Sequence, residues 1–319
     1  MGSLNNSPSP HFRGKMTTNI IMRDVLIALL PATLAGVYFF GIKVLAVVLV
    51  SITSCVLTEH VIAKIRKLET TIGDLSAAVT GLLLALVLPP SIPLWIPFIA
   101  GIVAIGLAKA VYGGLGHNIF NPALVGRAIA STAWPAIIAS AYFWPSTSAA
   151  WVTSFDALTT ATPLALVKMG QLPISALSNF YSNLFIGNIA GSIGETSVIM
   201  LLVGAAYLVI RGHIKLTIPL SYILTLGLIT FGYGYDPIFQ MLSGGLMLGA
   251  FFMATDYVTS PISTKGQLIF GVICGIITAF IRIFGGYPEG VNYAILIANA
   301  FVPMIDRLTV RKIFGEVKS

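Results

Sequence analysis

Long apolar runs separated by short polar or basic stretches set the pattern of this chain. A transmembrane helix needs about 20 mostly apolar residues, and a shorter run suits a helix that is tilted or broken. The pattern therefore predicts an all-α integral membrane protein with about ten transmembrane helices, several of them broken. The expected spans cover residues 25–41, 44–58, 75–88, 96–110, 122–142, 196–210, 216–231, 239–255, 268–280 and 291–305.

Composition agrees with a membrane protein. Of the 319 residues, 56% are hydrophobic and only 9% are charged, whereas charged residues make up about a quarter of a soluble domain. The net charge of +7 comes from Lys and Arg residues scattered between the apolar runs, as expected of cytoplasmic loops. We therefore expect the lipid bilayer, and no nucleic acid, as the partner of this surface.

The basic clusters predict the orientation of the chain. They lie at 64–67, 211–215 and 307–312, and they place both termini in the cytoplasm. The first residues are polar and basic, so we expect no cleavable signal peptide. We therefore divide the chain into a cytoplasmic tail (1–23), a first membrane half of about five helices (24–144), an extracytoplasmic segment (145–194), a second membrane half of about five helices (195–306) and a cytoplasmic tail (307–319).

The two membrane halves carry similar features in the same order. Gly113-Gly114 follows Lys109 in the first half, and Gly285-Gly286 follows Arg282 in the second. With an odd number of spans in each half, the two copies must have opposite orientations, so we expect an inverted repeat. Chance similarity between Gly-rich membrane helices is the competing explanation.

A polar stretch at 156–162 is the best candidate for chemistry. Thr162 followed by Pro163 is typical of a helix N-cap and first helical residue, and Gly170 would end a short helix over 164–169. Composition alone favours this ordinary helix start. A capping hydroxyl also lies where free backbone N–H groups favour a phosphate, so Thr162 is a candidate phosphate carrier.

The residues Asp156, Thr159, Ala161 and Thr162 resemble the flavinylation motif, with Thr160 where that motif usually has Gly. The blocks at 113–123 and 253–261 extend the resemblance over nearly the whole chain, and the chain is similar to the membrane D subunit of the Rnf electron-transport complex. The resemblance implies FMN bound covalently to Thr162 as a phosphoester, made by a flavin transferase that reads the motif residues Asp156, Thr159 and Ala161.

The resemblance also implies the function. It suggests a multi-pass flavoprotein subunit of the inner (cytoplasmic) membrane, with the flavin loop on the outer face. This subunit would relay electrons, beside the other Rnf subunits, in a complex that couples ferredoxin:NAD⁺ electron transfer to Na⁺ or H⁺ translocation. One alternative is the flavin-carrying B subunit of a sodium-pumping NADH:quinone oxidoreductase. The other is a non-redox channel or secondary transporter, since an inverted repeat would suffice for it.

A glycine-rich block at the inner edge of the membrane contains Asn118 and Asn121, and Arg127 follows it. Loose backbone at membrane depth must face protein or a wet cavity, so this block is a candidate ligand or ion site, with a plain cytoplasmic loop as the alternative. The family resemblance implies a second, noncovalent flavin, riboflavin or another, and Asn118, Asn121 and Arg127 are the candidate contacts.

Asp256 is a candidate for the ion pathway, because a carboxylate in hydrocarbon must be paired, wet or functional. The alternative is a helix-end residue in headgroup water. For Arg127 we consider snorkelling to the interface, a partner for Asp256, or a flavin phosphate. The histidines share no metal-ligand spacing, so we expect no metal site. Cys55 and Cys274 are expected to be packing residues, and no side chain is assigned a catalytic role.

Overall fold

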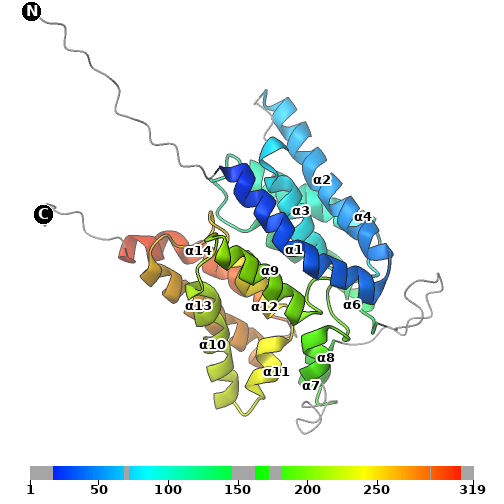
Figure 1. The fold of residues 1–319 in the computed structure, drawn as a ribbon, viewed down its shortest axis with the longest axis vertical. Coiled ribbons are helices and arrows are strands. Elements are labelled where there is room, and N and C mark those ends of the chain that lie inside the picture. Colours follow the sequence, from blue (N-terminus) through cyan, green and yellow to red (C-terminus); the bar gives the residue numbers. More distant parts are fainter. Residues whose placement is uncertain (1–16, 68–71, 146–161, 172–180, 288, 310–319) are drawn as a thin grey trace, which may run out of the picture.

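The computed structural model describes residues 17–67, 72–145, 162–171, 181–287 and 289–309, and every regular element in these ranges is a helix (Figure 1). An N-terminal group holds α1 (Thr18–Phe40), α2 (Lys43–Ile65), η1 (Ile72–Asp74), α3 (Ser76–Leu86), α4 (Trp95–Ile105), the π-helical turn η2 (Gly106–Ala110), α5 (Pro122–Ala133) and α6 (Pro135–Ser140). After α7 (Pro163–Lys168) and α8 (Tyr181–Ile186), a C-terminal group holds α9 (Val198–Ile210), α10 (Thr217–Gly232), α11 (Pro237–Leu242), α12 (Leu246–Leu248), the π-helical turn η4 (Gly249–Met253), α13 (Thr264–Phe284) and α14 (Val291–Thr309). The predicted all-α fold class is confirmed.

Four helices in the described ranges, α1, α2, α13 and α14, are long and apolar enough to cross a bilayer. Four shorter apolar helices accompany them: α3, α4 with its π-helical extension, α9 and α10. At a rise of 1.5 Å per residue the 11 residues of α3 cover only about 16 Å, roughly half of the hydrocarbon thickness. The membrane character is thus confirmed, whereas the expected ten spans stay a prediction.

Two of the expected spans are interrupted. The run over 239–255 is divided into α11, α12 and a π-helical turn, and the run over 122–142 is divided at Pro135, whose ring cannot continue the hydrogen bonds of α5. Helix α1 already begins at Thr18, so residues 18–23, which we expected in the N-terminal tail, are helical.

Two short buried helices begin at a residue with left-handed backbone. Leu75 (φ 64°) precedes α3, and Gly245 (φ 69°) precedes α12. A leucine in this region is uncommon, and the carboxylate of Asp74 stabilises the turn because it accepts hydrogen bonds from the N–H (2.7 Å) and the hydroxyl (2.6 Å) of Ser76.

A buried basic side chain supports the start of each of these two helices. The Lys109 ammonium donates to Glu59 (2.9 Å) and to the hydroxyl of Ser76 at the start of α3. Arg282 donates to the backbone carbonyls of Gln240 and Ser243, just before α12. Each cation therefore stabilises a non-helical turn inside the protein, where backbone groups without hydrogen-bond partners would be costly.

The two groups pack together through α1 against α9 and through α5 against α14. A side chain at Gly204 would collide with the Ala28 carbonyl, so α9 approaches α1 with a small-residue contact of the kind common between membrane helices. Near the beginning of α1, Asp24 contacts residues that follow α9, whereas Gly36 near its end lies against Ile193. The loop that precedes α9 and the loop that follows it thus lie at opposite ends of α1.

Candidate functional site

Thr162 is the N-cap of α7, as the sequence predicts. Its backbone is extended, Pro163 is the first helical residue, and its hydroxyl accepts a hydrogen bond from the N–H of Ala165 at 3.3 Å. Gly170, in left-handed backbone (φ 70°), follows the end of the helix. The other residues of the motif, Asp156, Thr159 and Ala161, lie outside the described residues.

Helix α7 is fixed against the C-terminal group by apolar and polar contacts. Leu164 is buried in a cluster with Leu184 and Phe239. The Lys168 ammonium donates to the carbonyls of Gly285 and Tyr287 (2.8 Å), and partial burial lowers the pKa of this side chain. These contacts hold Thr162, which is itself buried, over the segment that leads into α14.

A cavity of about 470 Å³ opens beside Thr162. Its size lies within the range of about 300–1,000 Å³ that is usual for ligand pockets. Most of its lining is apolar, which suits a flat aromatic ligand, and its polar groups converge from both groups of helices. The lining includes Leu124, Arg127, Ile138, Tyr142, Thr162, Glu195, Gly244, Gly245, Tyr287, Glu289, Asn292 and Tyr293.

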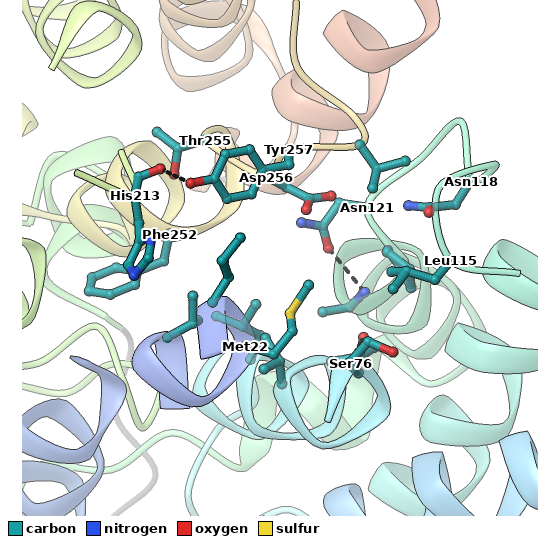
Figure 2. Close-up of a pocket in the computed structure, with 18 of the residues that line it drawn as sticks. Met22, Ser76, Leu115, Asn118, Asn121, His213, Phe252, Thr255, Asp256 and Tyr257 are labelled. Carbon is teal, nitrogen blue, oxygen red and sulfur yellow. Dashed lines mark hydrogen bonds between the residues drawn. The ribbon is translucent and has the colours of Figure 1, made fainter. Parts of the chain in front are cut away.

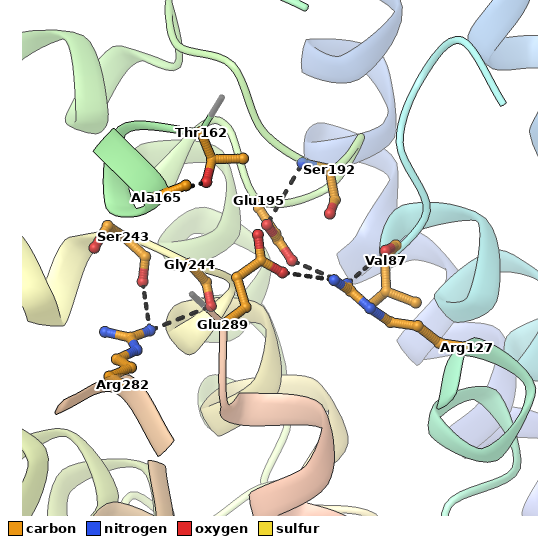
Figure 3. Close-up of polar contacts among 10 residues, drawn as sticks. All are labelled: Val87, Arg127, Thr162, Ala165, Ser192, Glu195, Ser243, Gly244, Arg282 and Glu289. Carbon is orange, nitrogen blue, oxygen red and sulfur yellow. Dashed lines mark hydrogen bonds and ion pairs between the residues drawn. The ribbon is translucent and has the colours of Figure 1, made fainter. Parts of the chain in front are cut away.

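Arg127 forms the polar centre of this cavity (Figure 3). Its guanidinium contacts the carboxylate of Glu195 at 3.2 Å and that of Glu289 at 2.5 Å, and it also donates to the carbonyl of Val87. Its three partners lie at the end of α3, before α9 and before α14. Arg127 on α5 thus joins the N-terminal group to two loops of the C-terminal part.

The turn before α12 closes the cavity on one side. Gly244 (φ 67°) and Gly245 (φ 69°) both have left-handed backbone. A Cβ at Gly244 would lie 2.8 Å from both Arg282 and Leu164, and a Cβ at Gly245 would collide with the Glu195 carboxylate. Glycine is therefore required at both positions, because of the left-handed backbone and because a Cβ would collide with its neighbours.

The Gly113-Gly114 and Gly285-Gly286 pairs, which we predicted to be repeat partners, differ in backbone conformation, because only the first pair has positive φ.

A second, smaller cavity of about 80 Å³ lies near the beginning of α1 (Figure 2). Asn118, Asn121 and Asp256 all line it, so the structure brings these three predicted residues together. Asn121 caps α5 and donates to the carbonyl of Met253 at 3.4 Å, while the half-buried Asp256 accepts from the Thr259 hydroxyl at 3.0 Å. A volume of this size holds an ion or a few water molecules and is below the usual range for organic ligands.

Arg127 corrects one of the sequence predictions. We grouped it with Asn118 and Asn121 and considered Asp256 as its partner, but its ion-pair partners are Glu195 and Glu289 in the larger cavity. It does not snorkel to an interface, because only 11% of its side chain is exposed. One buried and one mostly buried carboxylate, which the sequence analysis did not single out, hold it in the interior.

Asp24 is another buried acidic residue with charged partners that the sequence analysis did not single out. It is buried near the beginning of α1, where its carboxylate contacts His213 Nε2 (2.7 Å) and Arg211 Nε (2.9 Å). The hydrogen bond to Asp24 raises the pKa of Arg211. The basic cluster at 211–215, which we interpreted only as a topology signal, therefore also ties the end of α9 to α1. A lone acid at the start of an apolar run was the available signal.

Comparison with known proteins places the chain in a family. At 45% identity it is similar to the D subunit of the Na⁺-translocating ferredoxin:NAD⁺ oxidoreductase complex of Acetobacterium woodii, over 99% of this chain and 96% of the relative. At the same identity it is similar to the D subunit of the proton-translocating ferredoxin:NAD⁺ oxidoreductase complex of Clostridium ljungdahlii, over 97% and 95%. The D subunit of the ion-translocating oxidoreductase complex of Methanosarcina acetivorans is 36% identical over 99% of each chain. A family model matches residues 5–315, and the chain belongs to the NQR2, RnfD, RnfE family.

Proposed function

We propose that this chain is the flavin-carrying membrane subunit of an ion-translocating ferredoxin:NAD⁺ oxidoreductase and that it holds FMN covalently on Thr162. The observation that carries the proposal is the position of the Thr162 hydroxyl, at the edge of a largely apolar 470 Å³ cavity with a charged centre. The names of the relatives support membership of such a complex, and the motif at 156–162 supports the attachment of FMN to Thr162.

The residues of the cavity fit a flavin. An isoalloxazine is flat, mostly apolar and has N–H and carbonyl groups along one edge. The Asn292 side-chain oxygen is buried in the cavity lining and has no hydrogen-bond partner among the described residues, so it is free to accept from such an N–H. When bound, the flavin supplies the electron chemistry, and the chain supplies attachment, orientation and charge.

Each motif residue has a separate proposed role. Thr162 provides the oxygen that is bonded to phosphorus, while Asp156, Thr159 and Ala161 are read by a flavin transferase. A covalent bond keeps the cofactor in place in every redox state. A second, noncovalent flavin near Asn118 and Asn121, as the resemblance implies, would require the 80 Å³ cavity to widen.

We also infer the orientation of the chain and an inverted repeat of about five helices in each half, about ten in all. The basic residues Arg211 and His213 lie beside Asp24 near the beginning of α1, which supports a cytoplasmic location for that end. The Thr162 cavity, which is lined in part by the loop at the other end of α1, is then extracytoplasmic.

The inverted repeat is supported by the matching roles of Lys109 at the start of α3 and Arg282 at the start of α12.

The two most similar relatives named above are equal in identity but named for different ions, so sequence similarity does not choose between Na⁺ and H⁺. Their names favour a ferredoxin:NAD⁺ complex over an NADH:quinone oxidoreductase. The covalent flavin distinguishes both from a channel or secondary transporter.

The attachment is tested on the full chain, produced in a host that has the transferase. In-gel flavin fluorescence and intact mass should show one FMN-phosphoryl group, and Thr162→Ala should lose both signals but remain folded, since loss of an N-cap costs about 1 kcal/mol. Thr162→Ser, which keeps the hydroxyl and the cap, is the matched control and should retain part of the flavin. Covalent fluorescence in Thr162→Ala would move the acceptor elsewhere, with Thr160 as the nearest candidate.

A further inference from the structure

The charges around the cavity become unbalanced when a phosphate is attached to Thr162. Its lining contains one guanidinium, Arg127, and two carboxylates, Glu195 and Glu289. Arg282 lies behind the Ser243–Gly244 turn, where its N–H groups donate to backbone and amide oxygens. Within the described ranges it makes no ion pair at 4 Å or less. Its buried guanidinium nevertheless interacts electrostatically with both carboxylates. Arg127 and Arg282 together therefore balance Glu195 and Glu289, and a phosphodiester on Thr162 would add one excess negative charge.

The two carboxylates are held unequally. Glu289 contacts Arg127 at 2.5 Å, whereas the contacts of Glu195 are longer: 3.2 Å to Arg127 and 3.4 Å to the N–H of Ser192. The Glu195 side chain is also the more buried, at 6% exposure against 15% for Glu289. A buried carboxylate with weaker stabilisation is the member of such a pair that binds a proton first.

The remaining titratable groups at the cavity do not take over this role. Tyr142, Tyr287 and Tyr293 line it with their phenol rings, and no histidine or lysine is among the described lining residues. Each electron that enters the cavity adds a negative charge to a region that already has an excess. Since uncompensated charge in a buried site is costly, the arrival of a proton at the weaker carboxylate relieves it.

We propose that Glu195 is the proton-exchanging group of this cavity, with Glu289 as the fixed partner of Arg127. For each electron that the bound flavin receives from a one-electron carrier of a partner subunit, one proton from water binds the Glu195 carboxylate. An O–H bond of a hydronium ion breaks as the O–H bond on Glu195 forms, no bond of the chain breaks, and the proton returns to water when the electron leaves. This inference rests on the proposed attachment of FMN to Thr162.

The test is a spectroelectrochemical titration of the bound flavin at several pH values, on the full chain with its covalent FMN. In the native sequence, the equilibrium for one-electron reduction should change tenfold per pH unit where Glu195 titrates, which is about 59 mV for a one-electron couple. Glu195→Gln should reduce this pH dependence to the part that comes from the protons of the flavin ring, and Glu195→Asp, which restores a carboxyl group, should recover the native dependence. Asp236→Asn, which removes a carboxylate that does not line the cavity and keeps an N-cap, should behave as the native chain.

A second measurement uses the native chain alone, so it tests the proposal even where Glu195→Gln does not accept flavin. Redox-difference infrared spectra of the native chain should show a carboxylic acid carbonyl band that appears on reduction. A pH-independent potential in the native chain, an unchanged slope in Glu195→Gln, or the absence of this band overturns the proton site. A native chain without covalent fluorescence instead refutes the attachment to Thr162, so the two failures are distinct.

Discussion

Removal of the Arg127 guanidinium tests whether the cavity is held together by charge. Arg127→Met keeps an apolar side chain of similar length but leaves the carboxylates of Glu195 and Glu289 without their shared cation. Their side chains are only 6% and 15% exposed, so water does not replace the lost partner. Removal of one partner from a buried ion pair costs about 3–5 kcal/mol.

This cost is large enough to measure as a shift in melting temperature. For a chain of this size about 2 °C of shift corresponds to 1 kcal/mol, so Arg127→Met should melt roughly 6–10 °C below the native protein in detergent. The triple variant Arg127→Met with Glu195→Gln and Glu289→Gln removes the unpaired charges. It should recover most of the loss, because isosteric neutral groups do not carry the same desolvation penalty.

Arg211→Met is the matched control, because Arg211 also pairs with a buried carboxylate, Asp24, but 44% of its side chain is exposed. It should shift the melting temperature much less, since water screens the exposed Arg211 guanidinium and His213 still contacts Asp24. Equal melting temperatures for Arg127→Met and Arg211→Met would refute the reasoning. So would a triple variant no more stable than Arg127→Met.

Two further outcomes follow from the fold. Gly245→Ala should melt at a lower temperature than the control Gly212→Ala. Both positions have left-handed backbone, but only at Gly245 would a Cβ collide with a side chain, that of Glu195. Equal melting temperatures would contradict this prediction. In sealed cells, an impermeant thiol reagent should label a cysteine at Ser148 but not one at Ser319, in a chain without the native cysteines, and labelling at Ser319 would reverse the proposed orientation.

Features that depend on neighbouring residues could be predicted from the sequence. The cap at Thr162 follows from a hydroxyl, a proline and a downstream glycine within nine residues, and the structure confirms it. The long helices α13 and α14 follow from apolar runs with few charges. Their ends could not be placed, because α13 begins at Thr264 under the cap of Ser263 rather than at the first strongly apolar residue.

The partners of Arg127 could not be predicted, because they are 68 and 162 residues away in the chain. Only the fold brings Glu195 and Glu289 together. Their rarity was nevertheless a usable signal. The chain has only 11 acidic residues, and each of these two glutamates adjoins a glycine near an apolar run, where an ionised group must find a partner.

The break at Leu75 has a similar explanation in long-range structure. Left-handed backbone is unfavourable for leucine, so no local rule predicts a turn there. Three polar contacts offset the cost: Asp74 accepts from the backbone and hydroxyl of Ser76, and the same hydroxyl accepts from Lys109. The expected span at 75–88 begins where α3 begins, but Lys109 is 33 residues away from Ser76, so the turn before the helix and its polar contacts could not be predicted.

Helix α3 connects the two cavities physically. Ser76 and Thr80 on its first turns line the small cavity with Asp256, and Val87, just after its last turn, lines the large one and accepts from Arg127. Over 11 residues the helix covers about 16 Å. Because it begins at a turn held by Lys109 and ends at a carbonyl held by Arg127, α3 is tied at each end to one of two buried cations. Helix α3 is therefore a short element in contact with both cavities.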